Sequence, residues 1–144
     1  MPKSTTVTMS KQTPAICLLI FAIAWVVVGC APSYESSVFG VVTLDNQPLP
    51  LGTVKFYPVG PGPVAYGKIN ADGSYAVKIG SDDGLPPGEY IVTVVSMTPP
   101  PEGVSRELGE LLTPQRYGQQ QSSDLKFTVE PGKNVIDLEL HSES

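Results

Sequence analysis

The sequence has few of the side chains that most often carry catalysis or bind metals. Its 144 residues include one histidine, His141, which lies near the carboxyl end with no second histidine to share a metal or a proton. Phosphate-binding loops, paired catalytic carboxylates and Cys-His metal spacings are absent. We therefore expect a protein that is not an enzyme and that needs no cofactor or metal. An enzyme whose carboxylates meet only in the fold is the alternative.

The rare cysteines and the single tryptophan fall on the amino-terminal side of the chain. Cys17 and Trp25 lie inside an uncharged run, residues 15–29, and Cys30 follows it. If this run is removed, no thiol pair remains, so the domain must be stabilised by its core alone. Without Trp25, tyrosines expected to be exposed are the candidates for an aromatic platform that binds carbohydrate, although tyrosines on a sandwich more often form strands. The candidates are Tyr57, Tyr66 and Tyr117.

Positive charge is also scarce. Nine Lys and Arg residues stand against 14 Asp and Glu residues, which gives a formal net charge of −5. Lys3 and Lys11 precede every acidic residue, so removal of the leader lowers the net charge by two, to −7. An acidic domain without a basic stripe is a poor nucleic-acid binder, and we expect no nucleic-acid partner.

Two acidic turns raise the question of calcium. Asp72, in the sequence NADGS, fits a hairpin turn better than a calcium loop, because the residues at the first and last loop positions cannot ligate calcium. Asp82 and Asp83, with Glu89 further along, could form a weak calcium site. Adjacent acids in a turn are more often solvated, and that is the simpler interpretation.

The amino-terminal residues have the pattern of an export signal. A polar segment with Lys3 and Lys11 precedes residues 15–29, which contain no charged residue. That run is shorter than the roughly 20 residues a membrane-spanning helix needs, and its length is typical of a signal-peptide helix. An uncleaved single-pass anchor is the alternative. We predict a signal peptide over residues 1–29.

The signal ends in Val27, Val28, Gly29 and Cys30, which resemble the bacterial lipobox position by position. The resemblance implies a diacylglycerol on the thiol of Cys30 and cleavage just before it. Two or more acyl chains give stable membrane anchoring where one does not. Residues 30–37 are then a tether. Ala31 stands where some bacteria read Asp as a retention signal, which favours the outer over the inner membrane of the cell envelope.

Beyond residue 37 the hydrophobic residues recur with a period of two, and turn residues interrupt them every eight to twelve positions. This pattern predicts an all-β domain, residues 38–144, with about seven short strands in a sandwich or barrel. The expected strands cover residues 38–44, 53–59, 65–70, 74–80, 89–97, 124–130 and 134–141. The expected inward residues are Val54, Phe56, Tyr75, Val77, Ile79, Tyr90, Val92, Val94, Leu125, Phe127, Val129, Ile136, Leu138 and Leu140.

Two turns predict hairpins. Ala71-Asp72-Gly73 connects the third and fourth strands, and Pro131-Gly132 connects the last two. Residues 97–123 have no alternation. Helical spacing of Arg106 and Glu110 predicts one or two helical turns there. So long an irregular segment is either an interaction surface or a flexible loop.

Four stretches, VFGVVTLDNQPLPLGTVKFYPVG, INADGSYAVKIG, LPPGEYIVTVV and PGKNVIDLEL, occur in that order. Together they resemble the bacterial carboxypeptidase regulatory-like domain, which implies a transthyretin-like antiparallel sandwich of seven strands. The segment from Pro114 to Tyr117 also fits small lipoproteins of this family. Asn46 stands where the family has Gly, and Asn tolerates the left-handed turn. The related hydroxyisourate hydrolases use several His and Arg residues and a Tyr-Arg-Gly-Ser ending, and this chain lacks that set, so we do not expect their activity.

These observations predict a lipid-anchored module of the cell envelope with a non-enzymatic binding or structural role. Its expected partners are the membrane, through the lipid on Cys30, and an envelope protein or a glycan. A glycan- or cell-wall-binding module on the same fold is the main alternative, and a small envelope enzyme is the second.

Overall fold

The computed structural model describes residues 34–103 and 109–143. The expected signal peptide, Cys30 and residues 31–33 lie outside the described residues, so the signal helix and the lipid attachment stay predictions. The described part contains ten strands and one short 3-10 helix, which confirms the all-β prediction. They are β1 (Ser36–Leu44), β2 (Gln47–Pro48), β3 (Gly52–Pro58), β4 (Ala65–Ile69), β5 (Ser74–Ile79), β6 (Asp82–Asp83), β7 (Gly88–Val95), η1 (Gln115–Gly118), β8 (Lys126–Val129), β9 (Gly132–Val135) and β10 (Leu138–Leu140).

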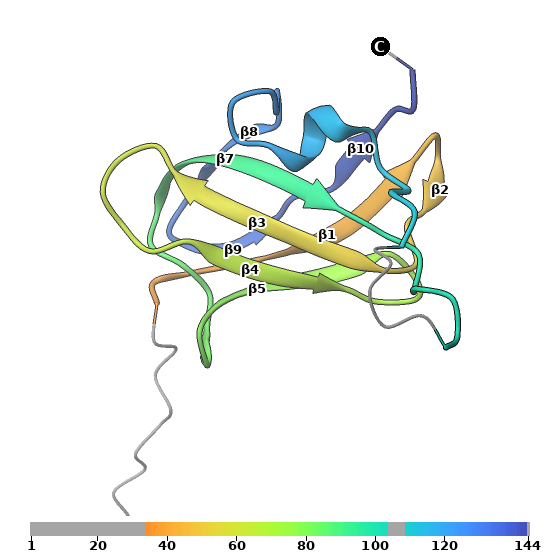
Figure 1. Ribbon diagram of the computed structural model, residues 1–144. Coiled ribbons are helices and arrows are strands. Elements are labelled where there is room, and N and C mark those ends of the chain that lie inside the picture. Colours follow the sequence, from red (N-terminus) through yellow and green to blue (C-terminus); the bar gives the residue numbers. More distant parts are fainter. Residues whose placement is uncertain (1–33, 104–108, 144) are drawn as a thin grey trace, which may run out of the picture. The chain divides into compact units, whose positions relative to one another are not determined.

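The strands form a curled sheet in the order β10-β1-β5-β4-β3-β7-β8 (Figure 1). β2 and β6 are two-residue additions to β1 and β5, and β9 pairs with β1 ahead of β10. Among the described strands the pairings are antiparallel, except that β9 and β10 run parallel to β1. The six strands expected before residue 131 are present. The expected strand at residues 134–141 is divided between β9 and β10.

The predicted hairpin between the last two expected strands is wrong. β8 pairs with β7, whereas β9 pairs with β1 at the other end of the sheet. Only Glu130 and Pro131 separate β8 from β9. Because consecutive Cα atoms are about 3.8 Å apart, the two strand ends lie within about 12 Å of each other. Such a short crossover requires the sheet to curl until its two ends approach.

The core fills the inside of this curl, and the period-two pattern predicted many of its members. The core residues that it did not predict are Val38, Val42, Leu49, Ala65, Ile69, Leu85 and Tyr117. Val54, Phe56, Val92 and Val94 are completely buried. The remaining expected inward residues are buried as well, apart from three that are half-buried and pack against the core. Those three are Ile79, Leu125 and Phe127. Tyr75 and Tyr90 both pack their rings beside Phe56, with centroids 6.3 Å and 6.0 Å away.

β1 lies very close to the backbone of Ile136, in the segment that connects β9 to β10. A Cβ atom at Gly40 would lie 2.0 Å from the carbonyl oxygen of Ile136, so only glycine fits there. Tyr75 on β5 is the cross-strand partner of Gly40. Its buried hydroxyl donates a hydrogen bond of 2.6 Å to that same Ile136 carbonyl. Burial of the ring raises the pKa of Tyr75.

The β4–β5 turn forms the hairpin that the sequence predicts. The Gly73 N–H donates to the Asn70 carbonyl at 2.9 Å. The Asp72 carboxylate accepts hydrogen bonds from the hydroxyl of Ser74 at 2.6 Å and from its N–H at 3.0 Å. These bonds, the hydroxyl first, lower the pKa of Asp72. Gly73 has φ of +84°, which favours glycine.

The β8–β9 crossover is held by a different device. The side-chain amide of Asn134 accepts from the Glu130 N–H at 2.9 Å and donates to the Glu130 carbonyl at 2.8 Å. The same amide donates to the Gly132 carbonyl at 3.1 Å. The Gly132 N–H in turn donates to the Glu35 carbonyl, just ahead of β1. An amide clamp therefore fixes the passage from one end of the sheet to the other.

The chain enters the fold earlier than expected. β1 begins at Ser36, two residues ahead of the predicted domain start at residue 38. Ser36 is buried, and its carbonyl accepts a hydrogen bond of 3.0 Å from the Leu85 N–H. The turn between β1 and β2 has Asp45 and Asn46 at positive φ, which confirms that Asn46 can hold the left-handed conformation.

Candidate functional site

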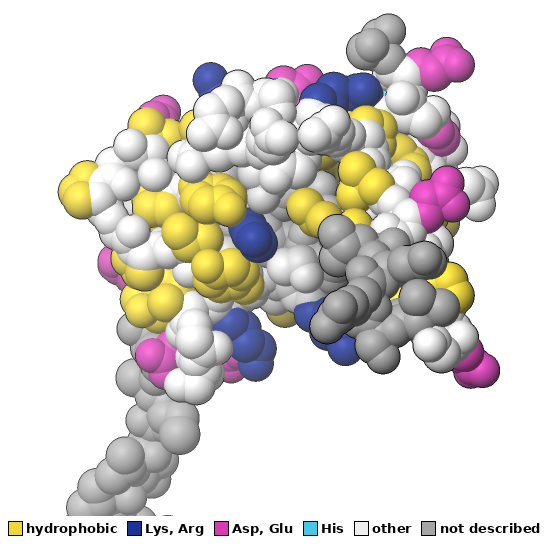
Figure 2. Space-filling view, in the orientation of Figure 1, with side chains coloured by type: hydrophobic (Ala, Val, Ile, Leu, Met, Phe, Trp, Pro, Cys, Tyr) yellow, Lys and Arg dark blue, Asp and Glu magenta, His cyan; other side chains and the backbone are white. Residues whose placement is uncertain are grey.

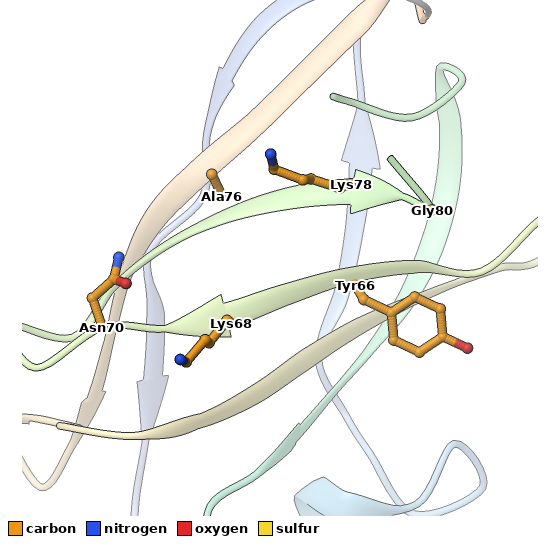
Figure 3. Close-up of a pocket in the computed structure, with 6 residues that line it drawn as sticks. All are labelled: Tyr66, Lys68, Asn70, Ala76, Lys78 and Gly80. Carbon is orange, nitrogen blue, oxygen red and sulfur yellow. The ribbon is translucent and has the colours of Figure 1, made fainter. Parts of the chain in front are cut away.

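The outer face of β4 and β5 carries a hollow of about 510 Å³. The residues that line it are Tyr66, Lys68, Asn70, Ala76, Lys78 and Gly80. Figure 3 shows the lysine side chains reaching toward the Asn70 end of the hollow, with the Tyr66 ring at the opposite end. Ala76 and Gly80 are small, which leaves the space between the longer side chains open.

The strand register explains why these groups gather. Outward residues of neighbouring strands face each other, with Cβ atoms about 5 Å apart. Lys55 on β3 and Lys78 on β5 are the two cross-strand partners of Tyr66. Lys68 follows Tyr66 by two residues on β4 and therefore lies on the same face. One exposed aromatic ring thus shares this face with three lysines. The Lys55 ammonium lies beside the ring, whereas Lys68 and Lys78 reach toward the Asn70 end of the hollow. We call Lys55, Tyr66, Lys68 and Lys78 the lysine-tyrosine face.

The charges of this face are only partly neutralised within the described residues. Lys78 forms a salt bridge of 2.9 Å with Asp83 on β6, and both side chains are more than half exposed. An ion pair so exposed contributes little to stability and can open to a competing anion. The Lys55 ammonium lies 5.8 Å from the Tyr66 ring centroid, within cation–π range. Figure 2 shows Lys and Arg side chains among hydrophobic ones across the outer surface of these strands.

Of the three candidate tyrosines, the structure leaves one clearly exposed. Tyr66 is 49% exposed, and Tyr57 is half-buried. Tyr117 is 4% exposed, so its expected exposure is wrong. It belongs to η1, packs into the core and accepts a hydrogen bond of 3.2 Å from the His141 N–H. Sequence alone could not show this, because residues 97–123 have no alternation to assign faces.

The other candidate residues remain apart from the lysine-tyrosine face. Cys30 lies outside the described residues. His141 is exposed at the end of β10, where its carbonyl accepts a hydrogen bond from Arg116. Beside it, the Ser142 side chain and N–H bond the carboxylate of Asp45 and lower its pKa. These contacts attach the carboxyl-terminal residues to the fold.

The acidic turn offers no metal centre in the described residues. Those residues contain no group of three or more His, Cys, Asp or Glu side chains that could hold a metal ion. Asp83 is occupied by its salt bridge to Lys78, and Asp82 is exposed beside it on β6. The calcium interpretation of Asp82, Asp83 and Glu89 therefore finds no support there.

Part of the segment expected to be an interaction surface or a flexible loop covers an edge of the sheet. β8 pairs only with the first half of β7, and residues 109–125 continue along the second half. The Val92 N–H donates to the Leu125 carbonyl at 2.8 Å, and the Ser123 hydroxyl donates to the Val92 carbonyl. Further along, the Thr113 hydroxyl accepts from the Ser96 N–H at 3.2 Å.

This covering gives residues 109–125 a structural role, because an uncovered strand edge invites pairing with other chains. Thr113 and Ser123 are buried, and their hydroxyls replace the backbone groups of a regular strand. The expected helical turns partly lie outside the described residues, since 104–108 are not described. The helical turn that is seen, η1, falls later, at Gln115–Gly118.

Sequence reasoning singled out Tyr66 but missed its lysines. The signal that could have found them is the alternation itself, which sets Lys55, Lys68 and Lys78 on outward positions of three successive strands. Register decides whether such residues meet, and register depends on strand pairing.

Comparison of the chain with protein-family models, with curated proteins and with solved structures finds no match. Among the described residues, no helix is long and apolar enough to cross a membrane.

Proposed function

We propose that this protein is a lipid-anchored module of the cell envelope that binds or supports a partner without catalysis. The observation that carries the proposal is the Val27-Val28-Gly29-Cys30 sequence at the end of a charged and then apolar leader. The thiol of Cys30 would bear the lipid, and Cys30 would become the first residue of the mature chain. The membrane is then the first partner of the protein, with the outer membrane favoured over the inner.

The start of the fold fits such an anchor. Only residues 31–35 separate Cys30 from β1. Six Cα-to-Cα steps reach at most about 20 Å when fully extended. A lipid on Cys30 would therefore hold the domain against the membrane surface, where its outward faces meet other envelope components.

We also propose that the curled sheet is a transthyretin-like sandwich of seven main strands. What supports this is that one core cluster takes residues from β1, β3, β4, β5, β7, β8 and β10. The short β2 and β6 extend main strands, and β9 with β10 would count as one strand interrupted at Ile136 and Asp137. An experimental structure of the domain tests this; an open single sheet with one solvent-exposed apolar face would contradict it.

The anchor is tested by the intact mass of the full-length gene product extracted from bacterial membranes. We expect a chain that begins at Cys30 and carries the added mass of a diacylglycerol and any further acyl group. Cys30→Ser is the matched control, and it should remain unprocessed and unlipidated. A wild-type product that begins at Met1, or a mature chain without acyl mass, would contradict the proposal.

A further inference from the structure

We propose that the lysine-tyrosine face binds an acidic polysaccharide. The inference gives a location and a charge class to the glycan-binding alternative, and it does not depend on lipidation of Cys30. Three observations carry it: an exposed aromatic ring, three lysines on the same strand face as that ring, and an open hollow between the ring and two of the lysines.

The ring supplies the stacking surface. Tyr66 is 49% exposed on β4, and its position on a regular strand fixes the direction of its side chain. Sugar rings present apolar C–H faces that stack on aromatic rings, and Tyr offers such a surface at low entropic cost. Lys55, 5.8 Å from the ring centroid, lies on the β3 side of the ring and leaves the β5 side to the hollow.

The lysines supply recognition of negative charge. Lys68 and Lys78 extend from neighbouring strands toward the Asn70 end of the hollow (Figure 3). Their spacing follows the sheet, because diagonal neighbours on paired strands are about 7–8 Å apart. Carboxylates on successive sugars of a polymer can therefore meet successive ammonium groups. The Asn70 side chain adds an amide that can bond hydroxyls, although it now donates to the Ser74 hydroxyl at 3.0 Å.

A polysaccharide fits this face better than an anionic membrane does. The start of β1 marks the end of the fold from which the tether leaves. Two turns contact it there, through Leu85 bonding Ser36 and Gly132 bonding Glu35. The charged residues in or next to these contacts are four acids and one lysine, namely Glu35, Asp82, Asp83, Glu130 and Lys133, and Asp83 is paired with Lys78. Acidic residues therefore remain in excess at this end. Anionic lipid would be repelled by this end, while the hollow faces outward from the middle of β4 and β5.

The test is binding of the full-length protein, purified in detergent, to polygalacturonate, with neutral dextran as the comparison polymer. We expect binding to polygalacturonate that weakens as salt rises, because exposed charges are screened beyond about 10 Å at 0.1 M salt. The double variant Lys68→Gln/Lys78→Gln should bind about tenfold more weakly. Tyr66→Ala should lose about tenfold in affinity, and Tyr66→Phe, which keeps the ring, should bind like wild type.

Lys126→Gln is the matched control, since it removes one exposed lysine from β8, which β3 and β7 separate from β4. It should change affinity less than twofold. Equal binding to dextran, an equal loss in Lys126→Gln, or no binding to polygalacturonate would overturn the proposal. Another contrary result would be that the wild-type protein binds vesicles of anionic phosphatidylglycerol but not polygalacturonate, and that the Lys68 and Lys78 substitutions abolish the vesicle binding. A phosphate-bearing polymer, polyphosphate, serves as a further arm; preference for it over polygalacturonate would overturn the assignment to sugar acids.

Discussion

Two turns of this protein look alike in sequence and behave differently in the fold. Asp72-Gly73 joins β4 to β5, and Pro131-Gly132 joins β8 to β9. The first turn returns the chain beside the strand it has just left. The second sends it to β1, at the other end of the sheet. Turn residues thus specify where a strand ends, whereas the curl of the whole sheet decides which strand receives the chain.

The largest effect is expected where β1 receives the crossover. Gly40→Ala would place a Cβ atom 2.0 Å from the Ile136 carbonyl oxygen, and relief is difficult because the two nearest atoms both belong to the backbone of Ile136. We expect a loss of about 3 kcal/mol or more in the free energy of unfolding, measured by urea denaturation of the full-length protein. Gly60→Ala is the control, because a Cβ atom there meets nothing within 4 Å. A Gly40 variant as stable as the Gly60 variant would contradict the close packing of β1.

The two turn glycines sharpen the comparison directly. Gly73 and Gly132 have similar positive φ values, +84° and +94°, so each alanine variant carries about 1 kcal/mol of backbone strain. A Cβ atom at Gly73 would also lie 2.8 Å from the Val42 carbonyl, whereas one at Gly132 meets nothing within 4 Å. We expect Gly73→Ala to cost about 2–3 kcal/mol in total and Gly132→Ala about 1 kcal/mol. Equal losses in urea denaturation would show that strain alone acts at both turns.

Tyr75 connects the hairpin to the crossover, because its hydroxyl on β5 donates to the Ile136 carbonyl. Tyr75→Phe leaves that buried acceptor without its partner, and we expect a loss of about 1–2 kcal/mol near neutral pH. The raised pKa of Tyr75 sets the sign of the alkaline behaviour. The contribution of the Tyr75 hydroxyl to the free energy of unfolding is complete below the unfolded pKa of about 10. It is lost as pH rises through the folded pKa.

The phenylalanine variant cannot ionise at position 75, so its stability should fall less steeply above pH 10 than that of wild type. Denaturation at several pH values between 8 and 11 checks this, and parallel slopes for the two proteins would be the contrary result. Tyr90→Phe provides a comparison, since burial also raises the pKa of Tyr90 but its hydroxyl donates to the Pro86 carbonyl, away from the crossover.

The same contrast explains what sequence could predict here. Alternation depends on local geometry, so the inward faces of β3, β5, β7, β8 and β10 followed from it, as did the Asp72 hairpin. The partner of β9, the tight fit at Gly40 and the place of Tyr117 depend on contacts between residues far apart in the chain. The side-chain hydroxyls of Thr113 and Ser123 replace the backbone groups of a paired strand, and no local sequence pattern predicts that role.

In the candidate site, too, some features follow from local sequence and others depend on contacts between distant residues. Exposure of Tyr66 follows from its outward position on β4, but its neighbours Lys55 and Lys78 come from β3 and β5 and meet it only through the register. A one-residue slip in either pairing would turn the opposite face outward. The proposed lipid attachment at Cys30 is the reverse case, because its signal is a continuous motif that needs no fold to be recognised.

The smallest effect distinguishes the two turns by charge. A carboxylate, Asp72, holds the hairpin, and an uncharged amide, Asn134, holds the crossover. The pKa of Asp72 is lowered in the fold. The stabilisation that its carboxylate contributes is therefore present above the unfolded pKa of about 4 and is lost as pH falls through the folded pKa. Asp72→Asn should therefore lower the thermal midpoint slightly at pH 7, and this difference from wild type should shrink as the pH is lowered from 7 to about 2. Asn134→Ala should lower the midpoint at both pH values, because the amide it removes does not titrate. An Asp72 effect that persists unchanged at low pH would mean that its hydrogen bonds to Ser74, not its charge, hold the hairpin closed.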